Sequence, residues 1–149
     1  MNKKNTVQYL IAFTRIYLAV VFILSGLDKI NDLASFAQSI ENYRILPLSL
    51  VNIIAVTVPW IELVSGGLLL LGFYIKENST LILTLLIIFT AAIISAVLRD
   101  LDIDCGCQGT FDGQKVGILK IIENTALMIV SFLSIRFPRQ ILVFIKHKQ

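Results

Sequence analysis

The chain has 149 residues and a formal net charge of +3; 56% of its residues are hydrophobic and only 15% are charged. Its mean hydropathy of +0.83 lies well above that of a water-soluble domain of this size. This composition favours a protein embedded in a lipid bilayer, and it argues against a soluble fold and a nucleic-acid partner.

Four apolar stretches each approach the roughly 20 residues that a helix needs to cross about 30 Å of hydrocarbon. They occupy residues 8–27, 49–73, 79–98 and 117–135. The first stretch is too long for a signal peptide, contains Arg15 and lacks a small-residue cleavage site, so we expect it to remain as a helix. The sequence therefore predicts an all-α, polytopic membrane four-helix bundle, with residues 1–149 as a single domain.

A polar segment at residues 32–45 separates the first two spans. Its apolar residues, among them Phe36 and Tyr43, recur at three to four residue spacing, and Asn31 or Asp32 can cap the start of a helix. We predict a short interfacial helix at the outer membrane surface, with an ordinary polar loop as the alternative.

The distribution of basic residues predicts the orientation. The N-terminal tail, the loop after the second span and the C-terminal tail at residues 138–149 share one side of the membrane and carry more lysine and arginine than the other side. The positive-inside rule then places both termini in the cytoplasm and the segment between the third and fourth spans outside it. We predict a multi-pass protein of the bacterial cytoplasmic (inner) membrane, with its tail resting on the cytoplasmic leaflet.

Two ionisable residues lie well inside the predicted spans, where a charge costs about 2.5 kcal/mol or more. Arg15 is in the first span and Glu62 in the second, at depths that agree to within about 5 Å. We predict that they pair. The pair either locks two helices together or lines a polar pocket for a quinone or a proton path, and both alternatives stay open.

Further polar residues gather near the outer ends of the spans. Asp28 and Lys29 end the first span, where long side chains reach the interface at low cost. Glu123 lies at the depth of Arg99, and we predict a bridge between them. The candidate quinone pocket consists of Arg15, Glu62, Glu123 and Asn124.

The stretch "IDCGCQGT" holds the only two cysteines, Cys105 and Cys107, on the side predicted to be oxidising. Two cysteines fall short of the four ligands of a closed zinc site, so we predict no metal. A disulfide between them closes a very small ring around Gly106, staples little of the chain and is easily reduced. Exchange with an incoming thiolate is therefore the predicted chemistry, and a structural staple is the alternative.

These residues resemble the MauE branch of the DoxX-like membrane proteins. The resemblance rests on Arg15, "SGLDKI" at residues 25–30, Phe36 and Tyr43, "ELVSGGLLLLG" with Glu62, and "CGCQG" before the last span. The family is named for a protein needed to mature methylamine dehydrogenase, and the resemblance implies disulfide chemistry outside the cytoplasm with thioredoxin-like proteins. It places exchange on Cys105 and Cys107. The chain departs from the family pattern at Gln108, often aromatic, and at Glu123, often arginine.

Structural support is assigned to the polar residues Ser25, Asp28, Lys29, Tyr43 and Arg99. We predict a thiol–disulfide oxidoreductase or redox accessory subunit that sits in the lipid bilayer, works with a thioredoxin-like protein or a larger membrane complex, and has a quinone as candidate cofactor. Two alternatives remain: an integral assembly subunit of a larger envelope complex with non-catalytic cysteines, and a small quinone-linked subunit of an oxidoreductase.

Overall fold

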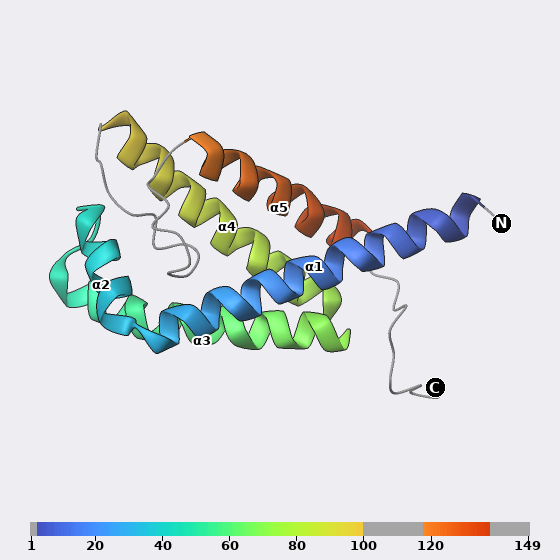
Figure 1. The fold of residues 1–149 in the computed structure, drawn as a ribbon, viewed down its shortest axis with the longest axis horizontal. Helices are drawn as coiled ribbons and strands as arrows, with labels where there is room; N and C mark the ends of the chain where they lie inside the picture. Colours follow the sequence, from blue (N-terminus) through green and yellow to red (C-terminus); the bar gives the residue numbers. More distant parts are fainter. Residues whose placement is uncertain (1–2, 100–117, 138–149) are drawn as a thin grey trace.

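The computed structural model describes residues 3–99 and 118–137, with side chains from residue 10 onward. Within those ranges the protein is all-helical and contains no strand (Figure 1). The helices are α1 (Lys3–Asn31), α2 (Leu33–Asn42), α3 (Leu48–Leu71), α4 (Ile75–Leu98) and α5 (Ile118–Arg136).

Four of these helices are long and apolar enough to cross a membrane. The candidate spans are Leu10–Asn31, Leu48–Leu71, Ile75–Leu98 and Ile118–Arg136. The predicted all-helical class and the multi-pass membrane architecture are confirmed for the described residues. The cysteine pair and the tail at residues 138–149 lie outside them.

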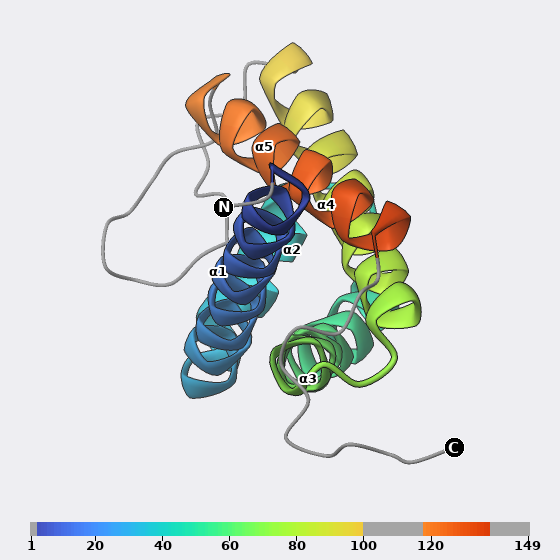
Figure 2. The same ribbon diagram turned by 90° about the vertical axis from the view of Figure 1, so that its right-hand side faces the viewer.

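The bundle consists of two closely packed helix pairs. Helix α1 makes its main contacts with α3, and α4 makes its main contacts with α5, as the end-on view shows (Figure 2). A buried cluster that includes Leu18 and Phe22 of α1, Leu69 of α3 and Ile82 of α4 joins the two pairs. Lipid tails are as apolar as these side chains, so close packing rather than hydrophobic force must hold the helices together.

Two glycines set the register of α1 against α3. A β-carbon added at Gly26 would lie 2.8 Å from the carbonyl oxygen of Pro59, and one at Gly66 would lie 3.0 Å from that of Ala19. Small residues at these points allow the backbones to approach closely. The helices therefore run antiparallel, with Gly26 level with Pro59 and Leu63.

Helix α2 begins where the sequence predicts a cap. The Asp32 carboxylate accepts a hydrogen bond from the Ser35 backbone N–H at 2.9 Å, and the helix ends at Asn42 with Tyr43 as its C-cap. Its buried residue Phe36 points into the bundle, because α2 packs against α3. A position of α2 in the membrane interface stays a prediction.

The helix ends form two groups at opposite ends of the bundle. The start of α1, the α3–α4 turn and the end of α5 lie together, while α2, the end of α4 and the start of α5 lie at the other end (Figure 1). The segment that carries the cysteines joins α4 to α5. It therefore leaves and re-enters the described structure at the end of the bundle occupied by α2.

Candidate functional site

A buried ion pair joins α1 to α3 near the α2 end of the bundle. The Lys29 ammonium donates to both oxygens of the Glu62 carboxylate, at 2.9 Å to Oε1 and 2.7 Å to Oε2. Lys29 is 4% exposed and Glu62 1% exposed, so both charges are removed from solvent. The close approach at Gly26, one turn before Lys29, brings the two helices near enough for this pair to form.

Ser25 hydrogen-bonds to both members of this pair. Its hydroxyl accepts from Lys29 at 2.6 Å and donates to Glu62 Oε2 at 3.3 Å. Ser25 and Lys29 are four residues apart and therefore lie on the same face of α1. Buried charges are tolerated when both pairing and hydrogen bonding are satisfied, and this triad meets that condition.

Two aromatic rings flank the Lys29 ammonium. Its nitrogen lies 5.3 Å from the ring centroid of Phe36 in α2 and 5.4 Å from that of Phe89 in α4. A cation within about 6 Å of an aromatic face is attracted by the ring's negative potential. Lys29 thus contacts α2, α3 and α4 in addition to its own helix.

Helix α5 adds polar groups to the same region. Lys120 is buried and donates to the half-exposed Glu123 at 2.9 Å, and its charge lies within electrostatic range of Lys29. One turn further along α5, Asn124 donates to the Thr90 hydroxyl of α4 at 3.3 Å. Asn124 therefore ties the first turns of α5 to α4, whereas Lys120 adds a second positive charge that repels Lys29.

The predicted pairing of Glu62 with Arg15 is wrong, because Lys29 occupies both carboxylate oxygens. Arg15 lies ten residues before Ser25, which is about 15 Å of helix rise, and α1 extends past the end of α3. The depth of each residue in the membrane was predicted from the ends of the apolar stretches, and this placed Arg15 too close to Glu62. Arg15 is nevertheless buried at 2% exposure.

The predicted bridge between Arg99 and Glu123 is also absent from the described residues. Arg99, at the C-cap of α4, donates to the backbone carbonyl of Tyr43 at 3.0 Å, whereas Glu123 pairs with Lys120. Arg99 therefore connects the end of α4 to the end of α2. Tyr43 itself is 8% exposed, and burial raises the pKa of its phenol to about 12.

The other site residues predicted from the sequence do not all lie in one place. Ser25 and Lys29 belong to the buried triad, and Asp28 lies beside Lys29 at the half-buried end of α1, close enough to add a favourable charge interaction. Cys105 and Cys107 lie outside the described residues. Arg15 lies in α1, Glu62 in α3, and Glu123 and Asn124 in α5. A quinone site formed by these four residues stays a prediction.

Two contributors to the cluster, Lys120 and Phe89, were given no role from the sequence. Lys29 was assigned structural support, but it was placed at the membrane interface, although it is buried. The signal available for Lys29 was its spacing of four from Ser25 and three from Gly26 on the buried face of α1. Phe89 lies in an almost uniformly apolar span, where no pattern distinguishes it.

The family model and the individual relatives that match this chain all point to the same family. The family model described as "Methylamine utilisation protein MauE" matches residues 7–137. The methylamine utilization protein MauE of Paracoccus denitrificans is 31% identical over 115 residues, which are 76% of this chain and 61% of that protein. The MauE protein of Methylorubrum extorquens is 28% identical over 121 residues, 80% of this chain and 65% of that protein.

A third relative, MauE of Methylophilus methylotrophus, is 27% identical over 131 residues, 87% of this chain and 69% of that protein. The chain thus spans about two thirds of the length of these relatives, and slightly less for the first two. No solved structure matches the chain significantly.

Proposed function

Because the chain belongs to the methylamine utilisation protein MauE family, we propose that it is a membrane thiol–disulfide exchange protein or redox accessory subunit. Its reactive groups are Cys105 and Cys107, and its partner is an extracytoplasmic protein of the thioredoxin-like class. The observation that carries this proposal is the placement of the only two cysteines, one residue apart, in the segment between two membrane helices.

The proposed reaction exchanges one disulfide for two thiols. A thiolate of the partner attacks one sulfur of the Cys105–Cys107 disulfide, which forms a mixed disulfide and releases the other cysteine as a thiolate. The second partner thiolate then attacks the mixed disulfide and releases the first cysteine. The partner's dithiol loses two electrons and two protons and becomes a disulfide. The cysteine pair gains both electrons and both protons and becomes two thiols.

The architecture around the cysteine segment supports this role. Arg99 fixes the end of α4 to α2, and Asn124 fixes the first turns of α5 to α4. The Lys29–Glu62 pair holds α1 and α3 together beneath the same end of the bundle. A reactive loop requires a rigid support, and these contacts provide one at both of its ends.

We further propose that both termini are cytoplasmic, that α2 lies at the outer interface and that the protein is related to the DoxX-like group. The start of α1 and the end of α5 lie at one end of the bundle, opposite α2 (Figure 1), which supports a common side for the termini. The relatives are named for methylamine utilisation, and we propose that the partner belongs to that process.

Purified protein and reduced thioredoxin as a probe test the exchange directly. We expect the oxidised chain to convert the thioredoxin dithiol to its disulfide in a one-to-one ratio, as measured by alkylation of remaining thiols and gel shift. The variant with both Cys105→Ser and Cys107→Ser must leave the thioredoxin reduced. Equal oxidation by wild type and this variant would reject the proposal.

An integral assembly subunit is the second candidate. It is favoured by the hydrogen bonds and the ion pair that join Lys29 and Ser25 of α1 to Glu62 of α3, which is what a helix lock requires. In that case the double serine variant supports methylamine-dependent growth as well as wild type does. It would also co-purify in a fixed ratio with the same partners.

A further inference from the structure

The charges of the chain are unevenly divided between the two ends of the bundle. The end occupied by α2, together with the segment that joins α4 to α5 there, has five basic residues and nine of the ten acidic residues, a net charge of −4. The acidic residues are Asp28, Asp32, Glu41, Glu62, Asp100, Asp102, Asp104, Asp112 and Glu123, and the basic residues are Lys29, Arg44, Arg99, Lys115 and Lys120. Eight basic residues and one acidic residue, Glu77, belong to the opposite end and the segments attached to it, a net charge of +7.

Burial makes the surface of the α2 end more acidic still. Lys29 and Lys120 are each 4% exposed and Glu62 is 1% exposed, so these three charges, which sum to +1, lie inside the bundle. The other charges of this end, including the segment at residues 100–117, sum to −5. The exposed charges among its described residues are those of Asp32, Glu41, Arg44, Arg99 and Glu123.

Helix α2 turns a polar face outward at this end. Gln38, Glu41 and Asn42 are exposed, whereas Phe36 is buried against the bundle. Asp32, at the start of the helix, is also exposed, and it lies nine residues from Glu41, about 14 Å along the helix. Among the described residues Glu41 has no ion-pair partner, so its charge is available to a molecule that approaches from outside.

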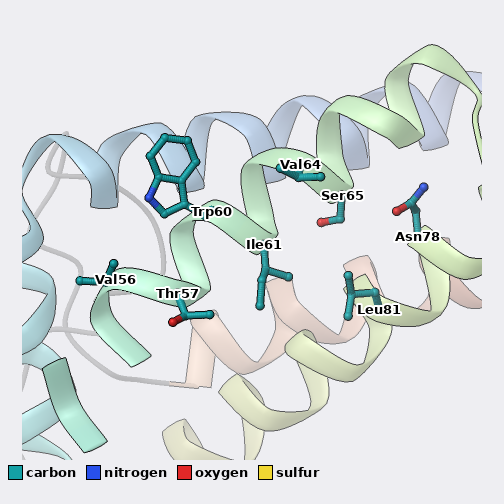
Figure 3. Close-up of a pocket in the computed structure, with 8 residues that line it drawn as sticks. All are labelled: Val56, Thr57, Trp60, Ile61, Val64, Ser65, Asn78 and Leu81. Carbon is teal, nitrogen blue, oxygen red and sulfur yellow. The ribbon is translucent and has the colours of Figure 1, made fainter. Parts of the chain in front are cut away.

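Insertion in the membrane does not explain these acidic charges. The positive-inside rule accounts for the basic residues at the opposite end, but acidic residues contribute little to orientation. The sides of the bundle are apolar: between α3 and α4 the half-exposed Val56, Trp60 and Val64 line an open groove that suits contact with lipid tails (Figure 3). Since an acidic surface also repels anionic headgroups, the α2 end is suited to a protein in the aqueous phase rather than to lipid.

From this charge distribution we infer that the α2 end is the docking surface for the redox partner, and that the partner meets it with a basic face. The inference rests on the proposed function and adds the chemistry of the partner, which has lysine and arginine side chains around its dithiol. Complementary charge speeds the encounter of two proteins and disfavours partners of the wrong sign. The segment that carries the cysteines is joined to the same end, so docking there brings the partner to it.

The salt dependence of thiol exchange tests this docking surface. The oxidised full-length protein, in nanodiscs of phosphatidylcholine, which has no net charge, is mixed with either of two reduced thioredoxin variants, one with lysines and one with glutamates around its dithiol. The loss of thioredoxin thiols gives a second-order rate constant. We expect the lysine variant to react about tenfold faster at low salt. Toward about 1 M salt, where the Debye length is about 3 Å, its rate should fall and that of the glutamate variant should rise.

Asp32→Asn combined with Glu41→Gln removes two of the exposed charges, and asparagine keeps the cap of α2. At low salt this double variant should slow the reaction with the lysine-bearing thioredoxin about threefold. It should not slow the reaction with dithiothreitol, which has no docking face. Glu77→Gln is the matched control, because it removes an exposed acidic charge at the opposite end, and it should leave both rates unchanged.

The inference is overturned if salt has the same effect on both thioredoxins, or if Glu77→Gln slows the reaction as much as the double variant does. A wild-type protein that oxidises neither dithiothreitol nor thioredoxin would reject the proposed thiol exchange, on which the inference rests.

Discussion

Lys29 joins side chains from four helices at one buried charge. Its ammonium binds Glu62 and Ser25 and is flanked by Phe36 and Phe89, so four helices depend on the position of one charge. A buried ion pair gives little net stability over apolar residues, but removing one partner leaves the other charge buried and unpaired. The pair therefore specifies which helices meet and in which register.

Substitutions at Lys29 and Glu62 test whether the two residues act as a pair. Lys29→Met or Glu62→Gln alone should lower the free energy of unfolding by about 3–5 kcal/mol, because each leaves one buried group without its partner. The double variant Lys29→Met with Glu62→Leu should recover most of that loss. Unfolding in mixed micelles measures the effect, with Lys76→Met at an exposed site as control. Additive losses in the double variant would show that the two residues do not act as a pair.

Tyr43 makes the folding stability of the protein fall at alkaline pH. Burial raises its pKa from 10 to about 12 in the folded protein. Above pH 10 the unfolded chain releases the phenol proton while the folded chain keeps it, so folding stability falls as pH rises from 10 to 12.

The loss should amount to roughly 2 kcal/mol at the upper end of that range. Unfolding measured at a series of pH values should show a shallower decline for Tyr43→Phe than for wild type. Parallel curves for the two proteins would mean that Tyr43 ionises equally in both states.

At the scale of elements, the contact between α1 and α3 rests on small residues. Gly26 and Gly66 each face backbone of the opposite helix, whereas a β-carbon at Gly67 would meet nothing within 4 Å. Gly26→Ala should therefore force the helices apart at about 1–3 kcal/mol, the usual effect of overpacking. It should also weaken the Lys29–Glu62 pair one turn away.

Gly67→Ala is the matched control in the same helix pair. It should be neutral or stabilise the protein by about 0.5–1 kcal/mol, because alanine loses less conformational entropy in a helix. Thermal unfolding in one detergent compares the two variants. If both substitutions have the same effect, close packing at Gly26 does not hold α1 against α3.

The elements themselves could largely be predicted from the sequence. Long apolar stretches identify spans because the bilayer demands about 20 such residues, and Asp32 marks the start of α2 through its capping carboxylate. The first predicted span ended at residue 27, whereas α1 continues to Asn31. Its polar end was placed at the surface because Asp28 and Lys29 are charged, although Lys29 is covered by α2 and α4.

The partners of the charged residues could not be predicted. The pattern of one helix shows which face is buried, but the register between two helices depends on contacts such as Gly26 with Pro59. That register brings Glu62 to Lys29 and leaves Arg15 about 15 Å away. Likewise, the carbonyl of Tyr43 that binds Arg99 is a backbone group, and no side-chain pattern reveals it.

For the whole molecule, the arrangement of helix ends leads to a topology prediction. The termini should be cytoplasmic and the cysteine segment extracytoplasmic, because the more basic stretches of the sequence adjoin the helix ends that lie opposite α2. A membrane-impermeant maleimide should label reduced Cys105 and Cys107 in intact spheroplasts. Epitope tags at the two termini should become accessible only after lysis. The reverse pattern would invert the orientation and place the cysteines in a reducing compartment.

The central claim is that the cysteine pair exchanges disulfides with a partner protein. Exchange is reversible, so in Cys107→Ser the remaining Cys105 thiolate attacks the disulfide of the oxidised partner and forms a mixed disulfide, with one partner thiolate released; the missing Cys107 can no longer resolve this species, and Cys105→Ser tests the same reaction at Cys107. Non-reducing electrophoresis of membranes from cells that express each variant reveals such species. The account predicts that at least one single variant forms a dithiothreitol-sensitive adduct with a thioredoxin-like protein, absent from the double serine variant. No adduct in either variant, together with an unchanged partner redox state in the double variant, would contradict it.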